Sequence, residues 1–336
     1  MGARVQVLGG GHRLVGDNAF AILANRFLQH LEVRAFSPLT VRAYAFDLAN
    51  FEIFLAGRAL DLAGVGAVDV FAYLDWQRSR GCPAASTMNR RVSTVRSWFE
   101  FLVMEGSVAR NPVPRARRTS GLRATRRGLL GHTARGGPVG GSQLVSTPRR
   151  LPESLDTDDV SVFLADLNTH RDRAIVLAMV LGGLRSGEVR SLRLADVDMG
   201  MRRVRVVGKG NRERLVPIDT VFFNECAAYL RDERPSGCTT PECFVVLRGP
   251  TRGGPVTEAG LRKVFRVHRS SSGATRVRPH RLRHTYATEL AAAGIDLLVL
   301  RELMGHASPD TTAKYVHLAP EALAAEFAAA RAVIGR

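Results

Sequence analysis

Hydrophobic residues recur at helical spacing through the first third of the chain and predict four helices joined by short loops. The first helix begins near Phe20. The second begins at Ser37-Pro38, where serine is a favoured cap and proline suits the first turn. The third covers about residues 68–80 and the fourth about residues 85–105. Because short loops separate apolar helices, we expect a compact helical domain over residues 19–112.

From about residue 151 the pattern is mixed. Helical spacing is seen over residues 171–184, 219–232, 257–269, 280–293, 297–304 and, in an Ala-rich segment, 320–333. Alternating apolar residues on both sides of the glycine-rich turn 208–211 predict a β-hairpin, and residues 244–247 predict a short strand. The predicted fold class is therefore mainly α with a small β-hairpin or sheet (α+β), and residues 151–336 form the second domain.

Two stretches lack such a pattern. Residues 1–18 are Gly-rich, and we expect them to form a flexible lead-in. Residues 113–150 contain nine arginines, no acidic residue and many Gly, Ser, Thr and Pro, which predicts a flexible linker. The linker either tracks a nucleic acid backbone or is a solvated insertion without a role, and its charge favours the first interpretation.

Composition narrows the class of partner. The net charge of +17 over 336 residues indicates a polyanionic partner. Nucleic acid is the first candidate because arginine and lysine neutralise phosphates. A ribosomal or generically adhesive basic protein is the alternative, but 45% hydrophobic residues favour a globular chain. No apolar run is long enough to span a membrane, and no signal segment is seen, so we expect a cytoplasmic, nucleoid-associated protein without a membrane partner.

Several side chains that could bind a phosphate, transfer protons or act as a nucleophile lie between residues 280 and 315. On a helix, His280, Arg283 and His284 share one face. Guanidinium binds phosphate oxygens, imidazole moves protons near neutral pH, and the phenol of Tyr315 is a possible nucleophile. The alternative is a buried histidine pair, a surface arginine and a core tyrosine. Residue types alone leave both interpretations open.

The order of the motifs resembles a known family. His-x-Leu-Arg-His at 280–284, Leu-Met-Gly-His at 303–306 and a tyrosine nine residues after His306 are similar to the signature of tyrosine site-specific recombinases, the phage-integrase family. Gly183–Glu188 resembles the family's first-arginine box. The turn around Lys209 resembles its lysine hairpin. The likeness covers about residues 20–330 in a two-domain, Xer-like arrangement.

The resemblance implies a reaction on DNA without a metal or other cofactor. Arg185 and Arg283 would hold the scissile phosphate while Tyr315 attacks it, giving a 3′-phosphotyrosine and a free 5′ hydroxyl. His280 would accept the tyrosine proton, and Lys209, because an ammonium donates a proton more readily than arginine, would supply one to the leaving oxygen.

Three further residues are expected to support this set. His306 would hydrogen-bond the phosphate or support Tyr315, and His284 would brace the helix. Glu188 would orient Arg185 through a charge-assisted bond, or act merely as a capping or surface residue.

A zinc site is the alternative interpretation of the two histidines. His280 and His284 have the spacing of zinc ligands, but Arg281 stands where a metalloprotease helix has its glutamate, and Arg283 would repel a cation. The four cysteines form no paired ligand motif. We therefore expect no metal.

The resemblance also implies partners. The helical domain would be a core-binding (SAM-like) domain that grips double-stranded DNA at a specific core site, and four protomers would assemble on synapsed DNA, with accessory DNA-bending or directionality proteins. The candidate DNA contacts are Arg90, Arg91, Arg96, Arg212, Arg262 and Lys263, although scattered basic residues are also usual on a solvated surface. The C-terminal helix would pack on its own domain or on a neighbouring protomer.

The predicted function is site-specific recombination for integration, excision or transposition of a mobile element. The alternatives are DNA relaxation of the type IB topoisomerase kind and a DNA-binding regulator that does not cleave. The complete set of expected residues speaks against the regulator.

Overall fold

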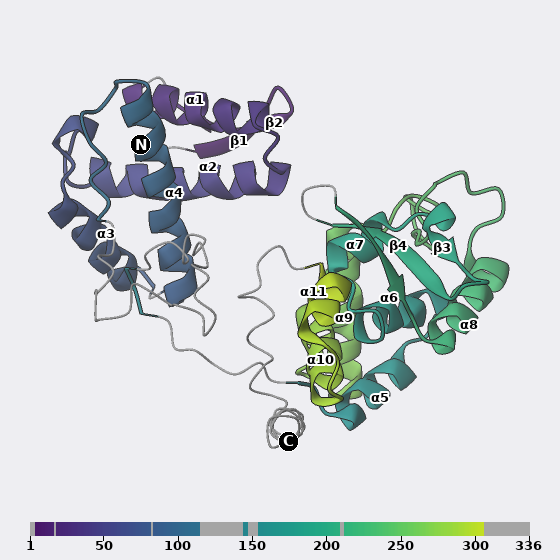
Figure 1. Cartoon of the computed structure of the whole chain (residues 1–336). Coiled ribbons are helices and arrows are strands. Elements are labelled where there is room, and N and C mark those ends of the chain that lie inside the picture. The colour runs from purple at the N-terminus through teal and green to yellow at the C-terminus, as the bar shows by residue number, and fades with distance from the viewer. Residues whose placement is uncertain are drawn as a thin grey trace, which may run out of the picture. The chain divides into compact units, whose positions relative to one another are not determined.

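The computed structural model describes residues 4–16, 18–81, 83–114, 144–146, 154–208 and 212–305. The chain divides into two compact units, an N-terminal unit (Met1–Arg149) and a C-terminal unit (Arg150–Arg336), each with its own hydrophobic core (Figure 1). Within the described ranges, no helix has both the length and the apolar character needed to cross a membrane.

The four helices predicted for the N-terminal unit are present. They are α1 (Ala19–Val33), α2 (Pro38–Ala56), α3 (Ala67–Ser79) and α4 (Ala85–Met104), with a 3₁₀ turn η1 (Leu62–Gly64) before α3. Ser37 caps α2 by accepting a hydrogen bond from the Thr40 amide, and Pro38 follows at the first helical position. The helices enclose a core rich in aromatic side chains, in which Phe51, Tyr73 and Trp98 are fully buried.

The lead-in predicted for residues 1–18 is wrong for its described part. Residues Arg4–Leu8 (β1) and Gly11–Val15 (β2) form an antiparallel hairpin whose turn is made by Gly9 and Gly10 at positive φ. Leu14 is buried in the helical core, and the Asn25 side chain bonds both the amide and the carbonyl of Leu14, each at 2.9 Å. The hairpin therefore belongs to the fold of the N-terminal unit.

The two ends of the predicted linker also pack on this unit. Val113 and Val145 are buried in its core, and the Asn89 side chain bonds the Val145 carbonyl at 2.8 Å and amide at 3.0 Å. Expecting flexibility there was wrong, because each end supplies an apolar side chain to the core. Residues 115–143 and 147–153 lie outside the described ranges, so for them the linker stays a prediction.

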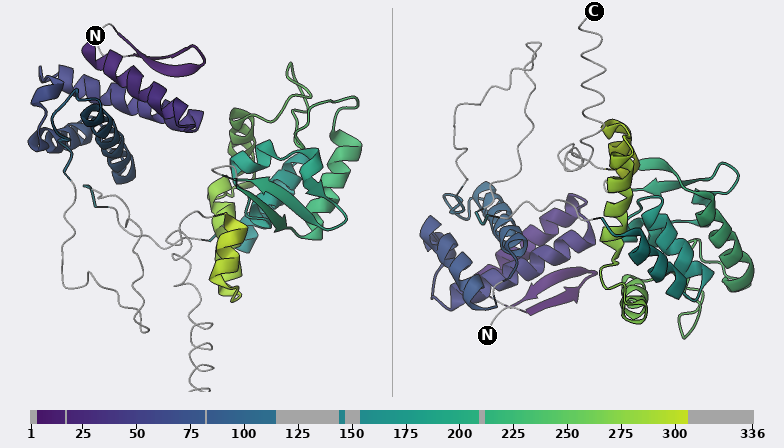
Figure 2. Two further views of the ribbon diagram at one scale, coloured as in Figure 1. Left: turned by 45° about the horizontal axis from the view of Figure 1, so that its top comes forward. Right: turned by 90° about the horizontal axis from the view of Figure 1, so that it is seen from below.

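The C-terminal unit is mainly helical with one small sheet, as predicted. Its helices are α5 (Thr157–Asp166), α6 (His170–Val180), α7 (Ser186–Ser191), α8 (Thr220–Ala228), a π turn η3 (Tyr229–Glu233), α9 (Glu258–Ser272), α10 (Pro279–Ala292) and α11 (Leu297–Met304). Helix α6 is central and packs against α8, η3 and α10. Figure 2 shows the sheet lying against these helices.

The sheet has three antiparallel strands in the order β3-β4-β5. The predicted hairpin is formed by β4 (Arg203–Val207) and β5 (Glu213–Pro217), and β3 (Val197–Asp198), which follows the short turn η2 (Leu194–Asp196), adds an edge that was not predicted. The strand expected at residues 244–247 is absent. The segment instead forms one isolated bridge, between Val245 and Pro255, and backbone hydrogen bonds join Phe244 and Val246 to residues 253–256.

Candidate active site

Arg185 lies just beyond the buried end of α6. The helix ends at Val180, earlier than predicted, because the chain turns at Gly182 and Gly183. Gly183 has φ +62°, and a Cβ there would lie 2.4 Å from the Tyr286 ring, so the turn requires glycine. The chain then buries Leu184 and begins α7 with Arg185 as its N-cap.

Glu188 contacts Arg185 through both backbone and side chain. Its carboxylate accepts a hydrogen bond from the Arg185 amide at 2.8 Å and one from the Arg185 guanidinium at 2.6 Å. The capping contact and the charge-assisted contact expected from the sequence are therefore both present. The surface interpretation is wrong, since Glu188 is only 7% exposed.

A second arginine, Arg214, approaches the same carboxylate and was missed by the sequence analysis. Its two terminal nitrogens donate to the two oxygens of Glu188, at 3.1 and 2.9 Å, and its Nε donates to the Leu303 carbonyl at 2.9 Å. No clear signal was available in the sequence, because adjacent Leu215 and Val216 are both apolar and either could mark the buried face of this strand. In the structure, Arg214 and Val216 are buried and Leu215 is exposed.

Arg283 reaches the cluster from α10. It is 4% exposed, donates to the carbonyls of Gly183 and Met304, and lies 3.8 Å from the Glu188 carboxylate. The structure thus brings together Arg185 and Arg283, which are 98 positions apart in the sequence, around one buried glutamate. We call Arg185, Glu188, Arg214 and Arg283 the arginine–glutamate cluster.

The same three arginines hold the end of α11. Arg214 donates to the carbonyl of Leu303, Arg283 to that of Met304, and Arg185 to that of Gly305 at 3.2 Å. The last carbonyls of a helix lack partners within it and form the negative end of its dipole, which makes them good acceptors for guanidinium groups. Gly305 ends α11 in the left-handed conformation and leads directly to His306.

The charges of the cluster do not cancel. Three guanidinium groups face one carboxylate, which leaves an excess of positive charge in a largely buried place. Burial raises the pKa of Glu188, but the hydrogen bonds and charges of Arg214 and Arg185 outweigh that effect and lower the pKa to about 2. Glu188 is therefore ionised at neutral pH, and the remaining positive charge suits the oxygens of a phosphate.

The two histidines of α10 form a pair, as their spacing predicts. Their Nε2 atoms are 3.0 Å apart, and their rings are T-shaped with centroids 4.3 Å apart. His280 is exposed while Arg283 turns into the buried cluster, so these side chains do not share one environment. A buried histidine pair with a surface arginine, the alternative drawn from the sequence, is the reverse of what is found.

Three of the predicted site residues, Lys209, His306 and Tyr315, lie outside the described residues, as does the helix expected at 320–333. The hairpin that carries Lys209 is closed by a hydrogen bond from the Gly208 amide to the Arg212 carbonyl at 2.8 Å. The roles of these residues stay predictions.

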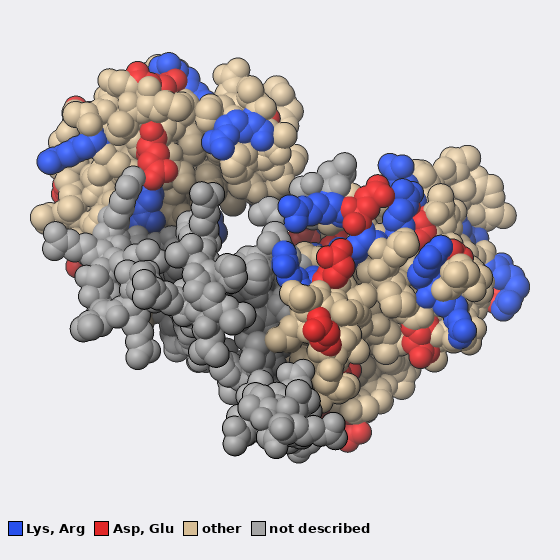
Figure 3. All heavy atoms as spheres, viewed as in Figure 1, with Lys and Arg blue, Asp and Glu red and all other residues tan. Residues whose placement is uncertain are grey.

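The candidate DNA-contact residues of the N-terminal unit make contacts within it. Arg90 pairs with buried Asp47, Arg91 donates to Gln77 at 3.0 Å, and Arg96 donates to the Pro114 carbonyl at 3.1 Å. In the C-terminal unit, the remaining candidates are exposed: Arg212, Arg262 and Lys263, of which Arg262 pairs with Glu258. On the face seen in Figure 3, basic and acidic side chains are interspersed on each unit.

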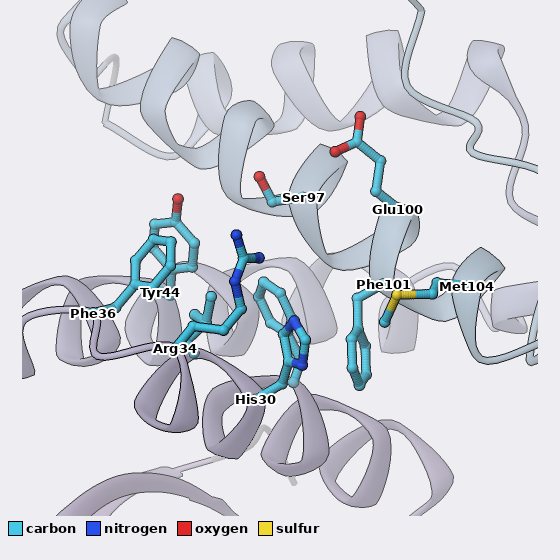
Figure 4. Close-up of a pocket in the computed structure, with 10 residues that line it drawn as sticks. His30, Arg34, Phe36, Tyr44, Ser97, Glu100, Phe101 and Met104 are labelled. Atoms are coloured by element: carbon cyan, nitrogen blue, oxygen red, sulfur yellow. The ribbon is translucent and has the colours of Figure 1, made fainter.

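Two other features of the structure concern ligand binding. Among the described residues, no three His, Cys, Asp or Glu side chains gather closely enough to hold a metal ion. A pocket of about 220 Å³ lies between α1, α2 and α4 of the N-terminal unit, and Figure 4 shows Arg34 inside it among aromatic side chains. Its lining includes none of the predicted catalytic residues, so it is separate from the candidate active site.

Comparison with known proteins gives consistent results for both units. Residues 153–322 match the model of the Phage integrase family, and residues 24–106 match that of the Phage integrase N-terminal SAM-like domain. The tyrosine recombinase XerC of Halalkalibacterium halodurans is 33% identical over 311 residues, covering 88% of this chain and 93% of the relative. XerC of Pelobacter propionicus is 30% identical over 308 residues, covering 88% and 91%.

Solved structures share the fold. The integrase of transposon Tn1549 in complex with transposon right-end DNA superposes with a TM-score of 0.68 at 16% identity, over 92% of this chain and 98% of that one. The XerH recombinase bound to its difH substrate gives 0.63 at 18% identity, over 89% and 82%. At these identities the likeness concerns the arrangement of the elements.

Proposed function

The chain belongs to the phage integrase family and is a tyrosine recombinase, an enzyme that breaks and rejoins DNA strands, and from this premise we propose how its residues divide the reaction. The observation that carries the proposal is the arginine–glutamate cluster. It gathers two predicted phosphate-binding arginines, Arg185 and Arg283, on one ionised glutamate and leaves positive charge in excess.

Arg185 and Arg283 bind the non-bridging oxygens of the scissile phosphate. Each guanidinium has five N–H donors in a fixed plane, so contacts to Glu188 or to the end of α11 leave further donors for a ligand. Their charge offsets the negative charge that develops on the phosphate oxygens as the nucleophile adds. Glu188 orients Arg185 from the side away from the substrate.

Tyr315 is the nucleophile. Its phenolic oxygen bonds to phosphorus while the bond from phosphorus to the 5′ oxygen breaks, giving a 3′-phosphotyrosine and a free 5′ hydroxyl. The phenolic proton passes to His280, and Lys209 supplies a proton to the leaving oxygen. The phosphotyrosine conserves the energy of the broken bond, so attack by a 5′ hydroxyl rejoins the strand.

Two histidines support these steps. His284 braces His280 through the contact between their Nε2 atoms, where one nitrogen must donate and the other accept, so the tautomer of one ring sets that of the other. His306 follows the end of α11, which the cluster holds, and contacts the phosphate or Tyr315.

The substrate is double-stranded DNA with a specific core site. A net charge of +17 supports a polyanionic substrate, and the SAM-like domain match supports a grip by the N-terminal unit. DNA contacts are proposed for the exposed residues Arg212, Arg262 and Lys263, and for the arginines Arg90, Arg91 and Arg96. Exchange between two duplexes requires four protomers on synapsed DNA, with accessory DNA-bending or directionality proteins as further partners.

We assign the biological role to integration, excision or transposition of a mobile element, carried out in the cytoplasm on nucleoid DNA. Relaxation of DNA without strand exchange, as in type IB topoisomerases, is the second candidate because the cleavage chemistry is shared.

Covalent capture of protein-linked DNA distinguishes recombination from relaxation. The protein is expressed beside its native flanking DNA, cells are denatured rapidly, and the ends of protein-linked DNA are sequenced, with Tyr315→Phe as control.

Adducts at one sequence that vanish in Tyr315→Phe support site-specific recombination and reveal the core site. Adducts without sequence preference favour the topoisomerase reaction. Specific DNA binding without any adduct would contradict both and point to a regulator.

A further inference from the structure

We propose that Arg214 is a positioning residue of the recombination reaction, which fixes the end of α11 to Glu188 and so holds that helix end beside the phosphate-binding arginines. The inference rests on the proposed function, because it concerns the same active site. It assigns a role to a residue that the sequence motifs did not single out.

The contacts of Arg214 join three elements through one rigid group. Its side chain is 5% exposed, and its guanidinium bonds both oxygens of Glu188 on α7 and, through Nε, the carbonyl of Leu303 on α11. Arg214 itself stands on β5, five positions after Lys209 in the same hairpin. One planar group therefore fixes the distances between the lysine hairpin, the start of α7 and the end of α11.

Arg214 differs from Arg185 and Arg283 because it has no proposed contact with the phosphate. Arg185 and Arg283 also donate to the end of α11, but their remaining N–H donors are assigned to the phosphate. Arg214 is assigned no phosphate contact, so its bonds to Glu188 and Leu303 persist when DNA is bound. Arg214 thus keeps the end of α11 in place during the reaction, while Arg185 and Arg283 bind the phosphate as well.

The backbone around Arg214 is fitted to its guanidinium. A Cβ on Gly305 would lie 2.8 Å from a terminal nitrogen of Arg214, and a Cβ on Gly208 would lie 3.3 Å from the same nitrogen. Glycine thus allows close approach on the side of α11 and on the side of the lysine turn. Lysine cannot replace this arginine, because one ammonium cannot bond both carboxylate oxygens and a carbonyl in a fixed plane.

The alternative is that Arg214 only stabilises the fold as the partner of a buried carboxylate. The two roles differ in the expected behaviour of Arg214→Lys. If charge alone matters, lysine restores most of the activity. If the planar geometry matters, lysine restores stability but not activity.

The test is single-turnover formation of the covalent adduct on a duplex bearing the core site found by covalent capture. The variants are Arg214→Lys and Arg214→Met, with Arg205→Met as the matched control. Arg205 lies on the adjacent strand β4, but its side chain is 47% exposed and pairs with Asp196 and Glu213 away from the cluster. Thermal unfolding and DNA affinity are measured for each variant.

We expect both Arg214 variants to form the adduct about 100-fold more slowly, because small misplacements of reacting groups cost about that much. Arg214→Lys should keep the thermal midpoint and DNA affinity of the wild type, and Arg205→Met should react at the wild-type rate. A rate for Arg214→Lys close to the wild type, or one reduced only in proportion to the unfolded fraction, would overturn the inference.

A second substrate distinguishes positioning from direct contact with the phosphate. A methylphosphonate at the scissile position removes one negative charge, which should partly offset the loss of a charge-neutralising arginine, as in Arg185→Ala. Arg214→Met should gain no such benefit, and an equal gain would overturn the positioning role. If the wild type forms no adduct, the proposed function itself fails, and this inference with it.

Discussion

Glu188 is a carboxylate that the fold keeps ionised in a buried place. Its pKa of about 2 lies below the ordinary value of 4.5, so the folded state binds its proton less readily than the unfolded chain does. A group with a lowered pKa contributes stability above its unfolded pKa and loses it as the pH falls through the folded value. The contribution is about 3 kcal/mol, complete above about pH 4.5 and lost between about pH 4.5 and 2.

We predict that Glu188→Gln destabilises the C-terminal unit by about 3–5 kcal/mol at neutral pH, because it leaves buried guanidinium groups without their counter-charge. The difference from the wild type should shrink as the pH falls below about 4.5, following the loss of the wild-type carboxylate. Urea unfolding followed by far-UV circular dichroism measures it. A difference that stays constant down to pH 3 would contradict the assignment.

Single residues also show where sequence reasoning stops. The pairing of Glu188 with Arg185 and of His280 with His284 follows from spacings of three and four positions, which bring side chains together within one turn of helix. Arg214 depends on Leu303, 89 positions away, and on Glu188, 26 positions away. No local pattern encodes such partners. Because Leu215 and Val216 are both apolar, the strand alternation did not show which face is buried.

At the scale of elements, the prediction succeeded where a long apolar stripe exists. Helices α1 and α2 have capping side chains, and apolar positions and short loops mark all four helices, so their existence and limits were readable. The hairpin of β1 and β2 was not, since each strand has five residues and Leu14 is its only fully buried side chain. The hairpin packs on α1 and α2, and the Asn25 side chain that bonds Leu14 belongs to α1 rather than to the hairpin.

This dependence predicts a contrast between two leucines of the hairpin. Leu14→Ala should destabilise the N-terminal unit by about 2–4 kcal/mol, because Leu14 is 2% exposed and leaves a cavity beside α1 and α2. Leu8→Ala is the matched control, since Leu8 is 51% exposed and should change the stability by less than about 0.5 kcal/mol.

Tryptophan fluorescence measures the stability of the N-terminal unit separately. Both tryptophans of the chain, Trp76 and Trp98, lie in the N-terminal unit, and buried Trp98 contacts Phe20 at the start of α1. Tryptophan emission during urea unfolding therefore follows this unit without interference from the other. Equal effects of the two leucine substitutions would mean that the hairpin is not part of the core.

At the scale of the whole molecule, the charge is unevenly distributed along the chain. Nine arginines without any acidic residue lie in residues 115–150, against a net charge of +17 for all 336 residues. Elsewhere, arginines that were candidates for DNA contact pair with neighbouring carboxylates, as Arg90 does with Asp47 and Arg262 with Glu258. The predicted linker therefore carries nine positive charges without an acidic residue of its own, and its electrostatic role can be measured.

We predict that the linker arginines contribute to DNA affinity through counterion release. Log affinity falls as log salt concentration rises, and each phosphate neutralised on duplex DNA makes this fall steeper by about 0.9. Changing Arg117, Arg118, Arg126 and Arg127 to glutamine should therefore reduce the slope by up to about 3 to 4. Fluorescence anisotropy with a labelled core-site duplex, recorded over a series of salt concentrations, measures it.

A protein with the order of residues 115–143 permuted is the matched control, because it keeps charge and length while changing the sequence. If the linker acts by charge alone, the permuted protein keeps the wild-type slope and cleaves at the wild-type rate. If the slope is kept but cleavage is lost, the order of residues matters and the linker makes specific contacts. An unchanged slope in the four-glutamine variant would show that these arginines touch no phosphate, and the segment would then be a solvated insertion.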